Sequence, residues 1–150
     1  MILTMEGMGI QLNSEFCGLP CRVLMNKAPP VAKADERLIE VTRKLVGEDY
    51  QALIVYEDQD PIGLITYKDI MRWLIETEDK ASLLVKDLVS VPLITVDIDT
   101  PLNDALGVMR KYGIGCLGVQ EHRTVRGLVT EEGIREFCEL YPHYLRQYSS

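Results

Sequence analysis

The sequence has few of the residues that build catalytic and metal sites. It contains two histidines and one tryptophan, and neither His122 nor His143 has a partner at the spacing of metal ligands. Structural zinc needs four ligands in tight clusters. A nucleophile also needs a base that can activate it, and no Ser/His/Asp or Cys/His set stands at usable positions. We therefore expect no metal site, no catalytic residues and no enzymatic activity.

Positive charge is also scarce. The chain has 16 Lys and Arg residues against 23 Asp and Glu residues, a formal net charge of −7, and the basic residues are scattered. Nucleic-acid phosphates require clustered Lys and Arg side chains, and an anionic membrane surface has the same requirement. The composition therefore predicts no nucleic-acid partner and no membrane partner.

Long hydrophobic runs are absent as well. No stretch reaches the roughly 18 apolar residues of a membrane span, and the apolar run 83–96 is interrupted by Lys86 and Asp87. The first basic side chain is Arg22, so the start lacks the positive region that precedes the apolar core of a signal peptide. These features predict a cytoplasmic protein.

The chain has four cysteines. Cys116 and Cys138 stand among apolar neighbours, which favours small buried core residues. Cys17 and Cys21 form a C-x3-C pair, for which we expect two reduced thiols, with a redox role as the open alternative.

A duplication organises the rest of the chain. Residues 37–74 align on 101–138 without a gap, and similar residues coincide in matching segments. The stretch GLITYKD at 63–69 recurs as GLVTEEG at 127–133, where Gly133 replaces Asp69. Clustered matches at one fixed offset indicate an internal repeat.

Each copy is predicted to fold as strand, helix, strand, strand, helix, which is an α+β arrangement with one hairpin. A short apolar turn precedes each copy, at 21–25 and 83–89. Thr100 and Pro101 resemble an N-cap followed by the first residue of a helix. The side chains expected to face the core from the helices are Leu38, Val41, Leu45, Ile70, Trp73 and Leu74 in the first copy, and Leu102, Ala105, Met109, Tyr112, Ile134, Phe137, Cys138 and Tyr141 in the second.

The repeat sets the expected domain boundaries. They are an N-terminal extension at 1–21, a first repeat at 22–76, a charged linker at 77–82, a second repeat at 83–141 and a C-terminal tail at 142–150. About 55 residues bury too little surface alone, so we expect the two repeats to pack on each other. The sequence indicates no role for the extension.

Over roughly 22–141 the pattern resembles a tandem pair of CBS domains (cystathionine-β-synthase domains), also called a Bateman module. The resemblance is carried by the G-h-h-T-x-x-D ending, present as GLITYKD and degenerate in GLVTEE, behind QALIVYEDQDPIGLIT and LNDALGVMRKYGIGCLGVQ. It implies two pseudo-symmetric β-α-β-β-α repeats and a homodimer. It further implies that adenosine-containing ligands bind between the repeats and regulate a separate effector protein.

The resemblance also implies a first ligand cleft. Asp69 would hold the ribose diol, Thr66 would lie near the sugar and phosphate, and the opposite repeat would enclose the adenine. The implied ligand-binding residues are Gly63, Leu64, Thr66, Lys68, Asp69, Leu93, Ile94 and Thr95. A second, degenerate cleft would combine Pro30 and Val31 with Thr130 and Gly133.

Two interpretations of the T-x-x-D motif remain open. Thr66 and Asp69 can form a capping box that serves only their own helix. The carboxylate can also accept hydrogen bonds from a ribose, with helix N–H groups favouring a phosphate. Gln51 stands where related proteins often have a basic residue, which disfavours polyphosphates and favours AMP, adenosine or S-adenosylmethionine. The alternative function is a ligand-free module for dimerisation or protein docking.

Overall fold

The structure is a computed structural model that describes residues 2–5, 10–13, 18–48, 50–79, 81–89 and 92–138. The chain divides into two compact units, which we call the continuous unit (Ala28–Ile94) and the split unit (Met1–Lys27 with Thr95–Ser150). Cys17, residues 1, 6–9 and 14–16 of the predicted extension, Tyr141 and the predicted tail at 142–150 lie outside the described residues.

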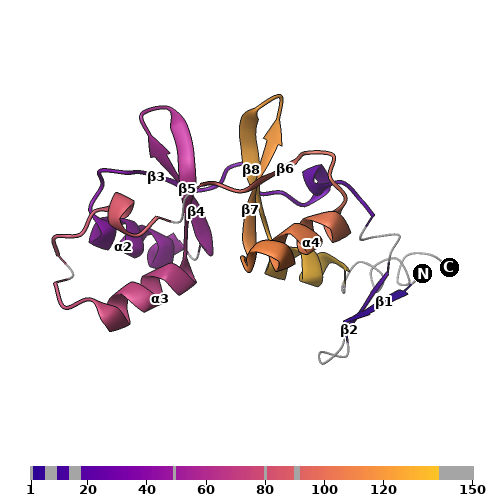
Figure 1. Cartoon of the computed structure of the whole chain (residues 1–150), viewed down its shortest axis with the longest axis horizontal. Coiled ribbons are helices and arrows are strands. Elements are labelled where there is room, and N and C mark those ends of the chain that lie inside the picture. The colour runs from indigo at the N-terminus through magenta and orange to yellow at the C-terminus, as the bar shows by residue number, and fades with distance from the viewer. Residues whose placement is uncertain are drawn as a thin grey trace. The chain divides into compact units, whose positions relative to one another are not determined.

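The continuous unit holds a three-stranded sheet in the order β3-β4-β5, with β3 parallel to β4 and β4 antiparallel to β5 (Figure 1). Its elements are β3 (Val31–Lys33), α2 (Leu38–Glu48), β4 (Ala52–Glu57), β5 (Asp60–Thr66), α3 (Tyr67–Glu76) and the 3-10 turn η2 (Val85–Asp87). The β4–β5 hairpin extends beyond the helices of its unit in Figure 1.

The split unit repeats this arrangement with a sheet in the order β6-β7-β8. Its elements are η1 (Cys21–Val23), β6 (Thr95–Asp97), α4 (Leu102–Tyr112), β7 (Cys116–Glu121), β8 (Thr124–Thr130) and a helix described over 131–138, together with a separate antiparallel pair of β1 (Ile2–Met5) and β2 (Ile10–Asn13). The predicted α+β repeat of strand, helix, strand, strand, helix is therefore confirmed.

The core of the continuous unit is built from the predicted helix stripe and the sheet. Leu38, Val41 and Leu45 of α2 recur every three or four residues and are all buried, which satisfies the period of an amphipathic helix. They pack with Ile70 and Trp73 of α3 and with alternate residues of the strands. Burial of each large apolar side chain contributes about 1.5 to 3 kcal/mol.

Two side chains that the pattern placed inward are exposed. Leu74 of α3 is 44% exposed and Tyr112 of α4 is 52% exposed. The prediction for Leu74 is wrong because this residue stands about 100° around the helix from Trp73, which places it at the edge of the buried stripe and not within it. The prediction for Tyr112 is wrong because this residue is the last of α4, next to the left-handed C-cap Gly113 with a φ of 65°.

The prediction that Thr100 caps α4 is also wrong. The residue before the helix is Pro101, which makes no side-chain cap hydrogen bond. The Leu102 N–H instead donates to the Leu19 carbonyl at 2.8 Å. A distant backbone segment thus supplies an acceptor that the local sequence does not reveal.

The turn that precedes the first repeat completes the split unit. The Cys21 N–H donates to the Thr100 carbonyl at 2.8 Å, and the Asn26 N–H donates to the Leu128 carbonyl at 2.8 Å. Asn26 lies so close to β8 that a Cβ on Gly127 would be 2.3 Å from the Asn26 carbonyl oxygen. Glycine at this motif position is therefore required by backbone approach.

The turn that precedes the second repeat does the same for the continuous unit. The Val85 N–H donates to the Glu36 carbonyl and the Lys86 N–H to the Ala34 carbonyl, both at 2.9 Å. Each compact unit therefore combines the body of one repeat with the leading turn of the other.

Both hairpins turn through residues with positive φ. His122 and Arg123 have φ values of 49° and 66° in the two-residue loop between β7 and β8, and Asp58 has 56° in the other loop. Two consecutive left-handed residues make the 122–123 loop a type I′ turn, which matches the strand twist but favours glycine.

Candidate functional site

Thr66 stands where β5 ends and α3 begins. Its φ of −116° and ψ of 168° are those of an N-cap residue, and its hydroxyl accepts the Asp69 N–H at 3.4 Å. The Asp69 carboxylate accepts the Thr66 N–H at 3.0 Å. This reciprocal pair is the predicted capping box, which the structure confirms.

One oxygen of Asp69 takes both hydrogen bonds. Oδ2 accepts the Thr66 N–H and also the Thr66 hydroxyl at 3.1 Å. Within the described part of the chain, no hydrogen bond falls on Oδ1, and the side chain is half-buried. Oδ1 of Asp69 can therefore accept a hydrogen bond from a ligand while the capping box stays intact. A diol that donated to both carboxylate oxygens would compete with Thr66 for Oδ2.

The donors at this helix start are partly committed. The Asp69 N–H serves the box, and the Tyr67 N–H donates to the Gln51 carbonyl at 3.3 Å. Lys68 is exposed and is the basic side chain within the predicted ligand set. A phosphate at this point would find fewer N–H groups than an uncapped helix start provides.

The matching point in the second repeat keeps the threonine and loses the acid. The Gly133 N–H donates to the Thr130 hydroxyl at 3.0 Å, so the cap survives without its reciprocal bond. Glu131 pairs with Arg135, whose Nη2 and Nε lie 2.6 and 3.2 Å from the same carboxylate oxygen. The charge of Glu131 is thus partly offset by Arg135.

The remaining predicted site residues occupy both units. Gly63 and Leu64 are buried in β5, and Leu93 and Ile94 are half-buried in the extended stretch before β6. Thr95 begins β6, Pro30 is buried with its carbonyl accepting the Ile54 N–H at 3.0 Å, and Val31 is 46% exposed. Each predicted cleft combines residues of the two units, so both clefts stay predictions.

The buried thiols are poor nucleophiles. Burial raises the pKa of Cys21 to about 11 and that of Cys116 to about 12. At neutral pH these groups are almost entirely protonated, and the thiolate is the reactive form. Cys138 is also buried. The redox alternative for the Cys17–Cys21 pair stays open because Cys17 lies outside the described residues.

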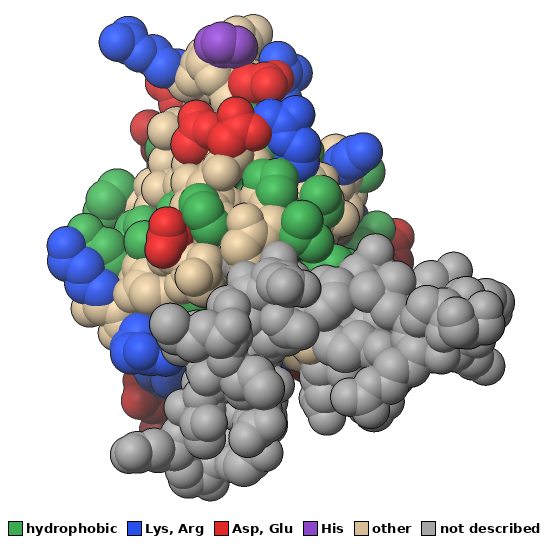
Figure 2. Space-filling view, turned by 90° about the vertical axis from the view of Figure 1, so that its right-hand side faces the viewer, with side chains coloured by type: hydrophobic (Ala, Val, Ile, Leu, Met, Phe, Trp, Pro, Cys, Tyr) green, Lys and Arg blue, Asp and Glu red, His purple; other side chains and the backbone are tan. Residues whose placement is uncertain are grey.

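Charged side chains of both signs meet on the split unit. Arg22 pairs with Asp99, whose hydrogen bond raises the pKa of the guanidinium, and Arg126 lies 3.6 Å from Glu121. Basic and acidic side chains stand side by side on the face shown in Figure 2. Exposed pairs of this kind contribute little to the stability of a fold, because water and salt screen the attraction.

The described residues contain neither a metal-binding cluster nor a membrane-spanning helix. No group of three or more His, Cys, Asp or Glu side chains there is arranged to hold a metal ion. No helix in that part of the chain has the length and apolar character needed to cross a membrane.

One set of residues was missed at the sequence level. Val46, Met71, Leu74 and Ile75 are large apolar side chains that α2 and α3 leave exposed. The alignment of the two copies could have identified these residues as exposed. Val46 and Met71 match Arg110 and Arg135 in the second copy. A position that one copy fills with arginine is not required for the core.

Comparison with known proteins assigns the family. The family model described as "CBS domain" matches residues 21–76 and 85–139, which together are more than half of the chain. The chain belongs to the CBS-domain family. The two matched CBS domains coincide with the two copies of the repeat. The resemblance to a tandem pair of CBS domains is therefore confirmed.

The CBS fold is shared with solved structures. A crystal structure of an uncharacterised conserved protein from Pyrococcus horikoshii has a TM-score of 0.73 at 24% identity, covering 80% of this chain and 92% of that one. The CBS domain pair of protein MJ0100, in complex with 5′-methylthioadenosine and S-adenosyl-L-methionine, has a TM-score of 0.71 at 24% identity, covering 83% and 97%.

The chain matches only part of the length of its curated relatives. The uncharacterised protein MJ0450 of Methanocaldococcus jannaschii is 28% identical over 116 residues, which are 75% of this chain and 62% of that protein. The matches span 62%, 24% and 52% of the lengths of three such relatives, so this chain covers only part of each.

Proposed function

We propose that this CBS pair senses an adenosine-containing ligand between its repeats and, as a cytoplasmic homodimer, signals to a separate partner protein. The observation that carries this proposal is Asp69, whose Oδ1 remains available beside Thr66 at the start of α3. The bound ligands of the MJ0100 CBS pair support the adenosine class.

The charges around α3 narrow the ligand. Lys68 is the basic side chain of the proposed site, and the Tyr67 and Asp69 N–H groups are already bonded. Several phosphate charges beside the Asp69 carboxylate would be poorly compensated. AMP, adenosine or the cationic S-adenosylmethionine therefore fit better than ADP or ATP.

The mechanism is linkage rather than catalysis. A ligand that contacts both repeats favours the arrangement in which those contacts are best made, and it shifts the population toward that arrangement. The partner protein would read the shifted population. CBS pairs act in regulation, and the described residues give no reason to assign this chain a reaction.

Calorimetric titration of the full chain with adenosine, AMP, ADP, ATP and S-adenosylmethionine tests the proposal. We expect Asp69→Asn to weaken the best ligand at least about tenfold, the equivalent of one good charged hydrogen bond. The 2′-deoxy analogue should lose a similar factor against the unaltered protein, because its missing hydroxyl cannot donate to Oδ1.

Asp87→Asn is the matched control. Asp87 also accepts a cap N–H, from Leu84 at 2.8 Å, but it has no proposed ligand role. Its replacement should leave the affinity unchanged. Absence of binding for every compound at about 1 mM, which corresponds to about 4 kcal/mol of binding free energy, would refute the sensor.

A ligand-free module for dimerisation or docking is the second candidate. It is favoured by the capping box itself, because Oδ2 satisfies the helix start and explains the T-x-x-D spacing without any ligand. Under this candidate Asp69→Asn lowers the stability and changes nothing else.

A further inference from the structure

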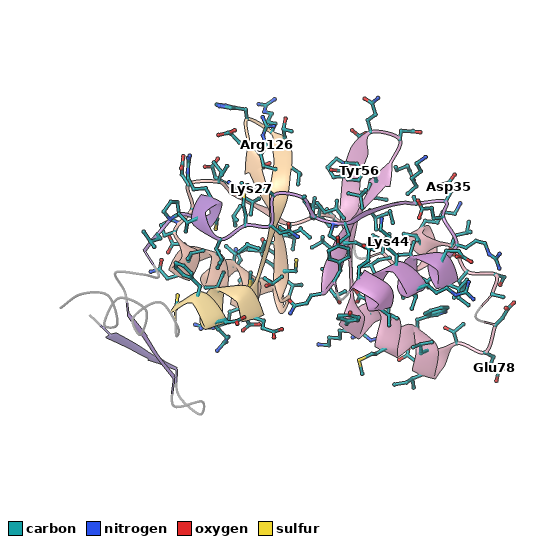
Figure 3. The ribbon with its side chains drawn as sticks, turned by 180° about the vertical axis from the view of Figure 1, so that it is seen from behind. Lys27, Asp35, Lys44, Tyr56, Glu78 and Arg126 are labelled. Atoms are coloured by element: carbon teal, nitrogen blue, oxygen red, sulfur yellow. The ribbon has the colours of Figure 1, made fainter. Side chains whose placement is uncertain are left out.

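The last turn of α2 contains a carbonyl oxygen that accepts hydrogen bonds from two tyrosines. The Leu45 carbonyl accepts the Tyr50 N–H at 3.0 Å and the Tyr67 hydroxyl at 3.2 Å. Both rings pack against the core of the continuous unit. Lys44, labelled in Figure 3, stands one residue before this carbonyl and marks its place on α2. Because Tyr67 is the first residue of α3, its hydroxyl joins the end of α2 directly to the start of the helix that carries the proposed ligand site.

The second repeat keeps the backbone bond and loses the side-chain bond. The Ile114 N–H donates to the Met109 carbonyl at 3.0 Å, the same distance as in the first repeat. The residue that matches Tyr67 is Glu131, whose carboxylate accepts from Arg135 and has no hydroxyl to donate. The fold therefore does not require the Tyr67 hydroxyl, and its bond is confined to the repeat of the proposed ligand site.

The turn that this bond holds is locally weak. Gly47 lies in it although a Cβ there would meet nothing within 4 Å, so neither space nor backbone conformation requires glycine. Glycine weakens a helix through its conformational freedom, and Glu48 places a negative charge at the helix end, which the helix dipole disfavours. Among the described residues, this turn of α2 holds no basic side chain, whereas Arg110 and Lys111 occupy the last turn of α4. The end of α2 therefore depends on its tertiary contacts more than the end of α4 does.

We propose that Tyr67 is a positioning residue that couples ligand binding at Thr66 and Asp69 to the order of the last turn of α2. This coupling rests on the ligand site of the proposed function and adds an output to it. A ligand that donates to Oδ1 of Asp69 fixes the start of α3, which holds the Tyr67 hydroxyl on the Leu45 carbonyl and closes the turn. The turn carries Val46, whose side chain is 65% exposed, so its ordering changes the surface of the continuous unit.

Linkage makes this coupling reciprocal. If ligand binding orders the turn, a change that orders the turn in advance must strengthen ligand binding. Gly47→Ala is such a change, because alanine favours the helix and its Cβ would meet nothing within 4 Å. If the turn only supported the fold, this variant would gain stability and keep its affinity. The two roles therefore give different results in a binding experiment.

Calorimetric titration of the full chain with adenosine, AMP, ADP, ATP and S-adenosylmethionine measures the affinity side of the coupling. We expect Gly47→Ala to tighten the best-bound compound by about three- to fivefold, within the equilibrium equivalent of a glycine-to-alanine change in a helix. Tyr67→Phe should weaken the same compound by a similar factor, because it removes one neutral hydrogen bond. In the double variant, Gly47→Ala should no longer tighten binding, since the connection between the turn and the site is gone.

Gly107→Ala is the matched control for the affinity measurement. Gly107 lies in α4 of the other repeat, and a Cβ there would also meet nothing within 4 Å. The variant should favour its helix as Gly47→Ala does. Because α4 lacks the tyrosine contact, Gly107→Ala should leave the affinity unchanged.

Hydrogen exchange of the full chain, resolved by NMR, measures the structural side. A saturating concentration of the best-bound compound should slow exchange of the Tyr50 N–H and leave that of the Ile114 N–H, which makes the equivalent bond in the other repeat, unchanged. In Tyr67→Phe the Tyr50 N–H should exchange about fivefold faster without the compound and gain no protection with it.

The outcomes separate this coupling from the sensor itself. An affinity that Gly47→Ala leaves unchanged, equal tightening by Gly107→Ala, or equal protection of the Tyr50 and Ile114 N–H groups would overturn the coupling and leave the sensor standing. Absence of binding by every compound of the panel would overturn both.

Discussion

The two repeats begin their last helices with the same threonine and differ three residues later. At Thr66 the cap is reciprocal, because Asp69 returns a hydrogen bond to the backbone. At Thr130 the cap is one-sided, because Gly133 has no side chain to return it. The distance from the threonine Oγ1 to the backbone nitrogen three residues later is 3.4 Å at Thr66 and 3.0 Å at Thr130.

This difference separates what the fold needs from what one repeat adds. Both helices form, so the threonine cap is sufficient for the turn from strand to helix. The carboxylate is an addition, confined to the repeat for which we propose ligand binding.

The largest expected contrast lies in the core under these two helices. Trp73 of α3 is 3% exposed, whereas Phe137, its counterpart, is half-buried. Trp73→Ala should cost about 3 to 5 kcal/mol of unfolding free energy and Phe137→Ala about 2 kcal/mol or less. Urea unfolding followed by circular dichroism measures both costs. Tryptophan fluorescence cannot be used, because Trp73→Ala removes the only tryptophan of the chain. Equal costs would show that the two cores are equivalent.

The next contrast concerns Cys116 and its counterpart Ala52, which are 3% and 5% exposed. Burial raises the pKa of the Cys116 thiol from 9.0 to about 12 in the folded state. Its stabilising contribution is therefore complete below pH 9 and is lost as the pH rises toward 12. The loss is about 1.4 kcal/mol per pH unit, or about 2 kcal/mol by pH 10.5.

The variant Cys116→Ala isolates that thiol. Chemical denaturation at pH 8 and pH 10.5 should show a smaller alkaline loss of stability in the variant than in the unaltered protein, because the titrating group is gone. Parallel pH profiles would mean that the Cys116 thiol ionises in the folded state as readily as in the unfolded state.

A transfer of the capping box tests the opening comparison directly. Gly133→Asp should stabilise the split unit by about 1 kcal/mol, because it supplies the missing reciprocal bond and removes a glycine from a helix. A Cβ there lies 2.9 Å from the Thr130 hydroxyl oxygen, so that hydroxyl must move toward the longer distance seen at Thr66. Thermal unfolding measures the gain, and a loss of stability would mean that it cannot move.

The smallest expected effect lies in the hairpin turns. Arg123 has a φ of 66°, a conformation that glycine adopts without the penalty of a Cβ. Arg123→Gly should raise the unfolding free energy by about 0.5 kcal/mol. Asp58→Gly should do less, because aspartate tolerates left-handed backbone better than arginine. Urea midpoints of the two variants provide the comparison.

Much of the fold could be predicted from local pattern. The three-to-four spacing of Leu38, Val41 and Leu45 identified a helix and its buried face, and the T-x-x-D spacing identified a capping box. Both features depend on residues within one or two turns of each other, where helix geometry fixes the neighbours. The family assignment rested on the order of such elements in two copies.

The errors lie where the chain contacts itself at a distance. The cap of α4 could not be predicted from Thr100 because the Leu19 carbonyl, far away in the sequence, supplies the acceptor. Leu74 was predicted to face the core because it stands in a run of three apolar residues, Trp73, Leu74 and Ile75, and the run alone does not reveal which of them faces solvent. Of the candidate site, the sequence located Asp69, but only the structure shows that, among the described residues, Oδ2 accepts two hydrogen bonds and Oδ1 accepts none.

The sequence by itself determined the duplication, the order of strands and helices and the capped start of α3, since these follow from periodicity and hydrogen bonds between near neighbours. Only the tertiary structure decided that the leading turn of each repeat completes the compact unit of the other. It also decided which apolar side chains remain on the surface. The physical reason is that backbone pairing between distant segments, and the burial it produces, depends on chain closure that no local pattern encodes.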